Sequence, residues 1–213
     1  MSSRAADRAS WRRVDGAYDA LRGRIRQRSC ALSNRVWVVT EDLRFGSDPA
    51  WFGRHTAELN ATNHALWRSC VWGRNLSGMM DGAGGVGSLL WVKQHTGDAL
   101  GAHFRGEDGN GNVVALISAP EGGETARYEY GPFGEPMRVT GAVAKENLFR
   151  FSTKRLDHAT GLVRYEYRVY LPTRGAGSAA IPSRRRALQL WGGDLVVCRA
   201  RARIAAGTCA TIP

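Results

Sequence analysis

The stretch that decides the fold runs Arg127-Tyr128-Glu129-Tyr130-Gly131-Pro132-Phe133-Gly134-Glu135-Pro136. Aromatic and polar residues alternate in it, and Gly-Pro punctuation follows the run. Alternation with a period of two is typical of a half-buried β-strand, so Tyr128 and Tyr130 are expected on one face and Arg127 and Glu129 on the other. Similar short runs and turns continue to residue 172. Residues 127–172 therefore predict strands and tight turns rather than helices.

A four-residue turn that ends in glycine occurs three times, and an apolar run follows each time. The turns are residues 81–84, 108–111 and 131–134, and their starts are 27 and 23 residues apart. Glycine suits such turns because one position takes φ > 0, and Asp or Asn closes them through a bond to the backbone. Each apolar run can bury itself only against a neighbouring unit, which predicts stacked hairpins in a ribbon-like sheet. The open edges of that sheet would invite pairing with another strand.

The first third of the chain is less regular. Residues 8–28 fit a short helix through the spacing of Val14, Ala17, Tyr18, Leu21 and Ile25, or alternatively a strand that ends in a turn. The pattern leaves both alternatives open. Residues 36–39 and 65–72 predict strands, whereas residues 43–56 are expected to form an aromatic loop.

Formal net charge is +11, but the excess lies at the two ends of the chain. Residues 1–30 hold eight arginines against three aspartates, and residues 171–213 hold seven arginines against Asp194, so the middle is neutral. Charge runs at chain ends are typically solvated tails. We expect the Arg-rich ends, including residues 184–186, to bind polyanions only weakly and in a salt-dependent way.

Several site classes find no support in the sequence. The four cysteines are scattered without metal-ligand spacing, and the five histidines share no motif, so we expect no metal site, no catalytic residues and no cofactor. No apolar run is long enough to predict a membrane span. Residues 1–8 show no apolar core of a secretory signal, so the sequence leaves the localisation unknown.

Residues 60–172 resemble the RHS-repeat (YD-repeat) associated core segment of large bacterial proteins. Residues 127–135 match the tyrosine/aspartate repeat, with Gly131 where Asp is usual, and residues 18–21 resemble a further, degenerate unit. The residues that carry the resemblance are the predicted structural repeat motif: Asp81, Gly84, Asp108, Gly111, Arg127, Tyr128, Tyr130, Gly131, Gly134, Phe149, Arg150, Phe151, Gly161, Arg168, Tyr170 and Pro172.

The resemblance implies a hollow β-shell built from hairpin repeats, which encloses a variable C-terminal domain, often a toxin. An Arg-Asp-Pro-x-Gly type motif, associated with self-cleavage, is expected directly after the core. After Pro172 this chain has no such motif, and the carboxylate that follows Glu166 is Asp194. Residues 175–183 can, however, be encoded so that the next reading frame spells Arg-Trp-Leu-Ser-Arg-Asp-Pro-Ile. This suggests the hypothesis that the reading frame shifts near Arg174 and that residues 175–213 are translated out of frame.

These observations predict an all-β fold of meandering antiparallel hairpins with irregular or disordered ends. The expected organisation is a basic segment over residues 1–30, a repeat core over 31–172 and an Arg/Ala-rich, disordered tail over 173–213. The predicted function is a non-enzymatic fragment of a β-shell concerned with toxin delivery or cell-surface interaction, with other repeat segments, or a second copy at an open edge, as partners. The alternative is a small basic protein that binds nucleic acid through its Arg-rich ends.

Overall fold

The computed structural model describes residues 11–19, 23–48, 54–80, 85–165, 168–174, 176–179 and 196–202. The expectation of an all-β fold of antiparallel hairpins is confirmed, since the regular elements described there are strands and two short 3₁₀ turns. The predicted turn at residues 81–84, with Asp81 and Gly84, lies outside the described residues.

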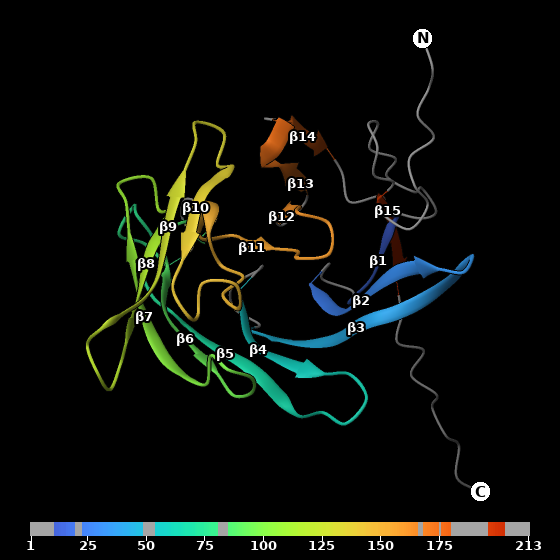
Figure 1. Cartoon of the computed structure of the whole chain (residues 1–213), viewed down its shortest axis with the longest axis horizontal. Helices are drawn as coiled ribbons and strands as arrows, with labels where there is room; N and C mark the ends of the chain where they lie inside the picture. The colour runs from blue at the N-terminus through green and yellow to red at the C-terminus, as the bar shows by residue number, and fades with distance from the viewer. Residues whose placement is uncertain are drawn as a thin grey trace, which may run out of the picture.

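Ten consecutive strands form one antiparallel meander in which each strand pairs with the next along the chain (Figure 1). They are β1 (Arg12–Tyr18), β2 (Arg24–Ser33), β3 (Val36–Ser47), β4 (His55–Asn60), β5 (Leu66–Trp72), β6 (Leu89–Gln94), β7 (Gly101–Glu107), β8 (Val113–Ser118), β9 (Glu124–Tyr130) and β10 (Pro136–Thr140). An eleventh strand, β15 (Val196–Ala202), pairs parallel to the outer edge of β1.

The meander is strongly curved. The strands follow an arc from β10 and β9 at one end through β4–β6 to β1 at the other (Figure 1). Every antiparallel pair in it except β6–β7 contains a shift of register. Such β-bulges bend a strand and increase its twist, so their repetition along the sheet accounts for the curvature.

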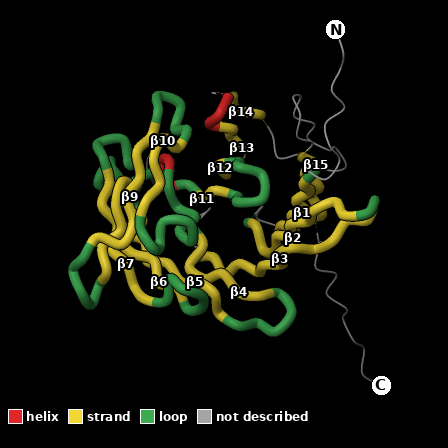
Figure 2. The backbone as a smooth tube through the Cα atoms, viewed as in Figure 1, coloured by secondary structure: helices red, strands yellow, loops and turns green. Residues whose placement is uncertain are grey.

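The later part of the chain folds back into the hollow of this sheet. A second, smaller sheet contains β11 (Arg155–Leu156), β12 (Val163–Arg164), β13 (Arg168–Leu171) and β14 (Ala176–Ala179). The 3₁₀ turn η3 (Phe151–Thr153) precedes β11, and η4 (Pro172–Arg174) lies between β13 and β14. The tube view places the smaller sheet inside the arc of the large sheet (Figure 2). We call residues 143–165 and 168–172 the interior segment.

Two apolar clusters join the concave face of the large sheet to the interior segment. Tyr128 packs in one of them with Val143, and Cys70 and Val92 pack in the other with Phe149. Full burial of side chains of this size stabilises a fold by roughly 1.5–3 kcal/mol each. The alternation predicted for β9 places Tyr128 inside, as its neighbours Arg127 and Glu129 are exposed.

The structure resolves the ambiguity of the N-terminal region. Residues 12–18 and 24–33 are strands, so the helical alternative is wrong, and β2 crosses the expected boundary at residue 31. The loop expected over residues 43–56 is also partly wrong. Its first five residues belong to β3, and His55 begins β4, because Phe45 and His55 stack across the pair at 4.4 Å between ring centroids.

The tail expected over residues 173–213 includes two segments that the structure describes as strands. Residues 176–179 pair with β13 as β14, and residues 196–202 pair with β1 as β15. Main-chain hydrogen bonding to an existing strand edge supplies order that local sequence does not predict. The other residues beyond 174, among them 184–186, lie outside the described residues.

Candidate functional site: the concave face of the sheet and the interior segment

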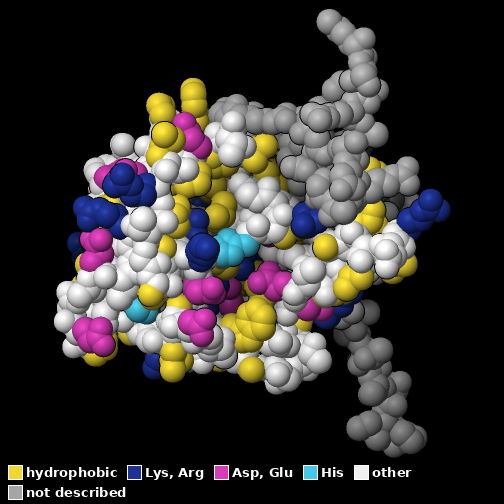
Figure 3. Space-filling model, in the orientation of Figure 1, with side chains coloured by type: hydrophobic (Ala, Val, Ile, Leu, Met, Phe, Trp, Pro, Cys, Tyr) yellow, Lys and Arg dark blue, Asp and Glu magenta, His cyan; other side chains and the backbone are white. Residues whose placement is uncertain are grey.

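Buried charged side chains concentrate where the interior segment meets the concave face of the sheet. Figure 3 shows positive and negative side chains side by side at the centre of the face that contains this contact. Charged residues are almost never fully buried unless they are paired. Three groups of such residues, around Glu58, Asp157 and Arg150, hold the interior segment in place.

Glu58 on β4 is the centre of the first group and is 1% exposed. Its Oε1 accepts a bond from Arg155 Nε at 2.9 Å, and its Oε2 accepts one from Arg68 Nη1 at 2.5 Å. Burial alone would raise the pKa of Glu58, but the charges of Arg155 and Arg68 outweigh burial and hold that pKa to about 2. One carboxylate therefore ties β11 to two neighbouring strands of the large sheet.

Asp157 forms the second group, at the end of the hollow near β2. Its Oδ2 accepts bonds from Gln27 Nε2 at 2.7 Å and Arg164 Nη2 at 3.1 Å, and its Oδ1 accepts one from Thr160 Oγ1 at 2.8 Å. Burial would raise the pKa of Asp157, but Arg164 and Thr160 keep it below its usual range. The bond from Gln27 links two residues that lie 130 positions apart in the sequence.

Arg150, a predicted motif residue, bonds to backbone rather than to a carboxylate. Its Nη2 donates to Ala144 O at 2.8 Å and its Nε to Asn147 O at 3.0 Å. The guanidinium carbon lies 5.2 Å from the ring centroid of Tyr128, whose hydroxyl donates to the same Ala144 oxygen. Arg150 and Tyr128 thus fix the first turns of the interior segment against β9.

The predicted turn at Asp108–Gly111 is the contact between the large sheet and η3. Asp108 Oδ1 accepts the backbone N–H groups of Asn110 and Asn112, both at 2.9 Å, and Gly111 has φ +74°. Thr153 Oγ1 donates to Gly111 O at 2.6 Å. Thr153 itself has φ +56°, which a β-branched residue adopts only when its surroundings impose it. The turn is therefore both a hairpin end and an anchor for the interior segment.

An aromatic series connects the remaining motif residues. Ring centroids lie 6.5 Å apart for Tyr128 and Tyr130, 6.2 Å for Tyr130 and Phe151, and 5.9 Å for Phe151 and Tyr170. Aromatic pairs at these spacings stabilise each other beyond simple burial. The predicted turn at 131–134 completes the contact, because the Tyr170 hydroxyl donates to Phe133 O at 2.6 Å.

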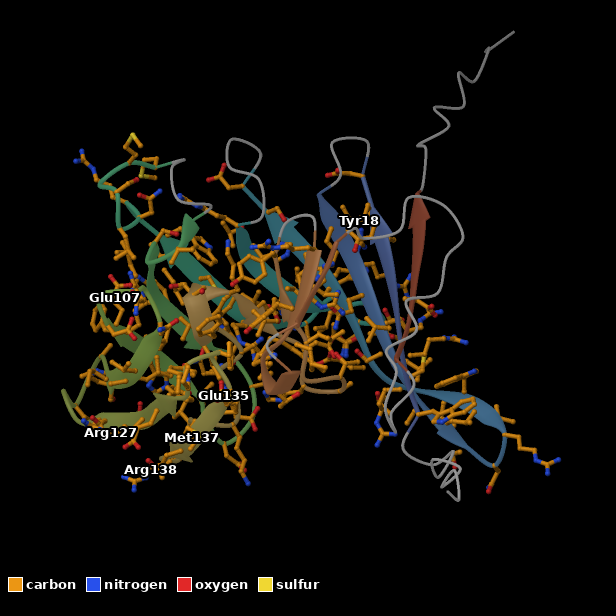
Figure 4. The ribbon with its side chains drawn as sticks, turned by 90° about the horizontal axis from the view of Figure 1, so that it is seen from above. Tyr18, Glu107, Arg127, Glu135, Met137 and Arg138 are labelled. Carbon is orange, nitrogen blue, oxygen red and sulfur yellow. The ribbon has the colours of Figure 1, made fainter. Side chains whose placement is uncertain are left out.

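Other motif residues lie outside this series. Phe149 makes an edge contact with Trp72 at 5.5 Å, and Pro172 begins η4 and is buried. Arg127 is exposed and pairs with Glu124 at 2.8 Å, pointing away from the interior (Figure 4). Gly131 and Gly161 belong to turns, and exposed Arg168 lies over the ring of Tyr165 at 4.9 Å.

Sequence reasoning missed the buried ion pairs of Glu58, Arg68, Arg155 and Arg164. A signal was present on β5, where Arg68 is two residues from Cys70 and so shares its face of the strand. A charged residue on the same face as a buried apolar one predicts an interior partner. The identity of that partner depends on the path of the chain back into the hollow, which local sequence does not contain.

The arrangement favours structural cohesion. Within the described ranges, no three His, Cys, Asp or Glu side chains are placed to hold a metal ion. In the same part of the chain, no helix has the length and apolarity that crossing a membrane requires. The charged side chains around Glu58 and Asp157 are bonded chiefly to one another and hold two layers together.

No protein-family model matches the chain, and no curated protein matches it significantly by sequence. Among solved structures, it is similar to TcdB2-TccC3 crystallised without its hypervariable C-terminal region, with a TM-score of 0.47, 18% identity and coverage of 76% of this chain. For a TcdB2-TccC3-Cdc42 structure the TM-score is 0.46, with 20% identity over 76% of this chain. For the Photorhabdus luminescens Tc holotoxin pore these values are 0.41, 16% and 75%.

This chain spans 7% of the length of the two crystallised TcdB2-TccC3 chains and 6% of the pore chain. TM-scores below one half at such identities carry no weight for function.

Proposed function

We propose that this chain is a non-enzymatic wall segment of an RHS/YD-repeat type β-shell, whose interior segment lines the inside of the wall. The observation that carries the proposal is the return of the interior segment, which carries part of the repeat resemblance, into the hollow of a curved hairpin sheet. Three hydrogen bonds to separate strands retain the segment there: Gln27 donates to Asp157, Arg68 donates to Glu146 O, and Glu58 accepts from Arg155. In this role the tyrosines of the motif pack the wall, and their chemistry is structural.

In the family that the sequence resembles, such a wall encloses or presents a C-terminal toxin or mediates cell-surface interaction. A shell requires that the wall continue beyond a single curved sheet. The strand edge of β10 is the natural place for continuation, because β9 is its one partner among the described strands. Other repeat segments, or a second copy of this chain, are the partners that this function implies.

The reading-frame hypothesis belongs to the same proposal. It holds that the parent gene continues from Arg174 into a segment with the Arg-Asp-Pro motif, in the frame next to the one translated here. The nucleotide sequence after the Arg174 codon decides it. Absence of that motif from both alternative frames would contradict the hypothesis and would leave the wall function unaffected.

Limited trypsin digestion of the full chain tests the enclosure of the interior segment. Arg150, Arg155 and Arg164 are buried, whereas Arg35 and Arg74 are exposed in a turn and a loop. We expect cleavage after the two exposed residues at least about 100-fold faster than after the three buried ones, since cleavage of buried bonds requires opening of the fold. Peptide mass spectrometry over time measures these rates.

Cleavage after Arg155 as fast as after Arg35 would refute the enclosure and with it the proposed function. The intact mass of the chain after long incubation without protease provides a second check. A product that ends near Pro172 would show self-cleavage and would contradict a non-enzymatic role.

The nucleic-acid alternative requires that the arginines of the ends be available. In the described part of the N-terminal region, Arg26 and Arg28 both pair with Asp42, at 2.7 and 3.0 Å, and Arg13 pairs with Asp15 at 3.0 Å. These pairs favour the wall function, because arginines that already have carboxylate partners contribute less to phosphate binding.

Fluorescence anisotropy with a labelled DNA duplex separates the two functions. For the wall segment we expect only weak binding at about 150 mM salt, with Kd above roughly 10⁻⁶ M, by the full chain and by a variant with Arg184, Arg185 and Arg186 changed to Ser. The alternative instead requires that the full chain bind with Kd below roughly 10⁻⁶ M. It also requires that the triple variant reduce the slope of log affinity against log salt by about 2.7, three phosphate contacts at 0.9 each.

A further inference from the structure

One buried arginine at the interface lacks a carboxylate. Asp157 forms an ion pair with Arg164, and Glu58 forms ion pairs with Arg68 and Arg155. Arg24 has no ion pair among the described residues. Arg24 is only 8% exposed. Its guanidinium carbon lies 5.7 Å from the ring centroid of Tyr18, which Figure 4 places on β1 at the far end of the sheet from β10.

A β-bulge accounts for the position of Arg24. Tyr18 pairs with Arg24 and Ala17 with Arg26, so Ile25 is an extra residue in β2. The extra residue interrupts the alternation of the strand, and Arg24 is buried together with Gln27, three positions later. Bulges commonly redirect a side chain in this way at functional positions.

Arg24 and Arg164 both retain hydrogen-bonding capacity. The Nε of each is buried, and within the described residues neither has a hydrogen-bond acceptor. Gln27 and Asp157 connect the two positions, since Gln27 donates to Asp157 at 2.7 Å and Arg164 donates to it at 3.1 Å. Leaving a buried charged donor without an acceptor is costly, so this end of the interface favours an additional anion.

The electrostatics support this geometry. Burial, and then the nearby positive charge of Arg164, lower the pKa of Arg24 to about 10, so the guanidinium is still protonated at neutral pH. His55 lies in the same field, and its own pKa is lowered to about 3 by burial and then by Arg24, so its imidazole is neutral. The two carboxylates of this field are already bonded to other arginines, Glu58 to Arg155 and Arg68, and Asp157 to Arg164. The charge of Arg24 therefore has no carboxylate partner among the described residues.

We propose that Arg24 and Arg164 together bind an oxyanion, either a phosphate or a carboxylate, at the β2 end of the interface between the sheet and the interior segment. The planar guanidinium groups offer paired N–H donors that match the oxygen spacing of both anions. Such a site would lie within the fold of this chain and does not depend on the shell function.

Thermal unfolding of the full chain at constant pH tests the site. Sodium phosphate, sodium acetate and sodium chloride are compared at equal ionic strength, so that general screening is the same. At a concentration about tenfold above Kd, the binding anion is expected to raise Tm by roughly 3–6 °C relative to chloride. A shift with phosphate identifies a phosphate site, and a shift with acetate alone identifies a carboxylate site.

Variants locate the effect. Arg24→Met should abolish the anion-dependent shift and melt no lower than the unsubstituted chain in chloride, because an uncompensated buried charge has been removed. Arg24→Lys retains the positive charge but loses the paired N–H donors of the guanidinium, so it should reduce the anion-dependent rise in Tm by more than half. Arg138→Met, at an exposed arginine, is the matched control and should retain the full shift.

Two results would rule out the anion site. One is that no anion raises the Tm of the unsubstituted chain above its value in chloride, and the other is that Arg24→Met shows an equal rise in Tm. The second would mean that the anion acts through general exclusion from the surface or through arginines elsewhere.

Discussion

Gly111 ends a hairpin turn of the large sheet, and its backbone also contacts the interior segment. Its φ is +74°, and a Cβ there would lie 2.6 Å from Val86 Cγ1 and 3.0 Å from the backbone nitrogen of Gly87. Its carbonyl also accepts the hydroxyl of Thr153. Glycine is therefore required for two separate reasons, conformation and space.

We predict that Gly111→Ala destabilises the protein by roughly 2–4 kcal/mol, from left-handed strain together with the steric conflict. Gly109→Ala is the matched control in the same turn, since Gly109 has no positive φ and its added Cβ would meet nothing within 4 Å. It should change stability by less than about 0.5 kcal/mol. Urea unfolding followed by tryptophan fluorescence measures both, and equal effects of the two substitutions would contradict the role of Gly111.

Individual residues of the candidate site differ in whether the sequence could predict their role. The alternation around Tyr128 and the glycine-terminated turns were predictable, because period and turn chemistry are local properties. The aromatic series from Tyr128 to Tyr170 joins residues that were all recognised as motif members. Glu58 was not recognised, because a carboxylate in a strand is ordinarily taken as solvent-exposed, and Arg155, its partner, lies 97 residues away.

Among the elements, strands were predicted best next to the glycine-ended turns, and less well around residues 43–56, where a loop was expected and parts of β3 and β4 are found. Residues 65–72 were expected as a strand and form β5 over Leu66–Trp72. Residues 12–18 were ambiguous, because Val14, Ala17 and Tyr18 fit helical spacing as well as a strand. Pairing with β2 resolves that ambiguity, and a pairing partner outweighs local propensity in a sheet.

The strands at the two ends of the large sheet differ in a way that local sequence does not reveal. Among the described strands β10 pairs with β9 alone, and it is short, with Pro136 at its start and Met137 and Arg138 exposed (Figure 4). Short length, proline and charge discourage unspecific edge-to-edge association. The continuation proposed at this edge therefore requires a matching repeat strand, not merely any open sheet edge. β1 instead pairs in parallel with β15, although the two strands lie near opposite ends of the sequence. Parallel partners so distant in sequence follow from the return of the chain, which no local period encodes.

At the scale of the whole molecule, the buried charges connect stability to pH. His55 and Glu58 lie on the same strand, both buried, with the pKa of His55 lowered to about 3 and that of Glu58 held to about 2. The folded protein therefore resists protonating either group until the medium is strongly acidic. The unfolded chain protonates both at their ordinary values, 6.5 and 4.5.

The sign of the effect follows from proton binding. Above pH 6.5 His55 is neutral in both states and adds no pH dependence, whereas below it the unfolded state binds the extra proton and folding is disfavoured. The contribution of the Glu58 carboxylate is fully present above pH 4.5 and is lost as the pH falls from there towards 2. Both groups make the protein less stable in acid, but His55 acts first.

We predict that lowering the pH from about 7 to about 5 removes about 2 kcal/mol of stability through His55 alone, 1.36 kcal/mol for each pH unit well below its unfolded pKa. His55→Asn should eliminate that part of the loss, because asparagine can still bond to Ser47 but does not titrate. His64→Asn, at an exposed histidine, is the control and should leave it in place. The measurement is the free energy of unfolding in urea at several pH values. A pH dependence in His55→Asn equal to that of the unsubstituted chain would mean that the imidazole of His55 takes up its proton in the folded protein as readily as in the unfolded chain.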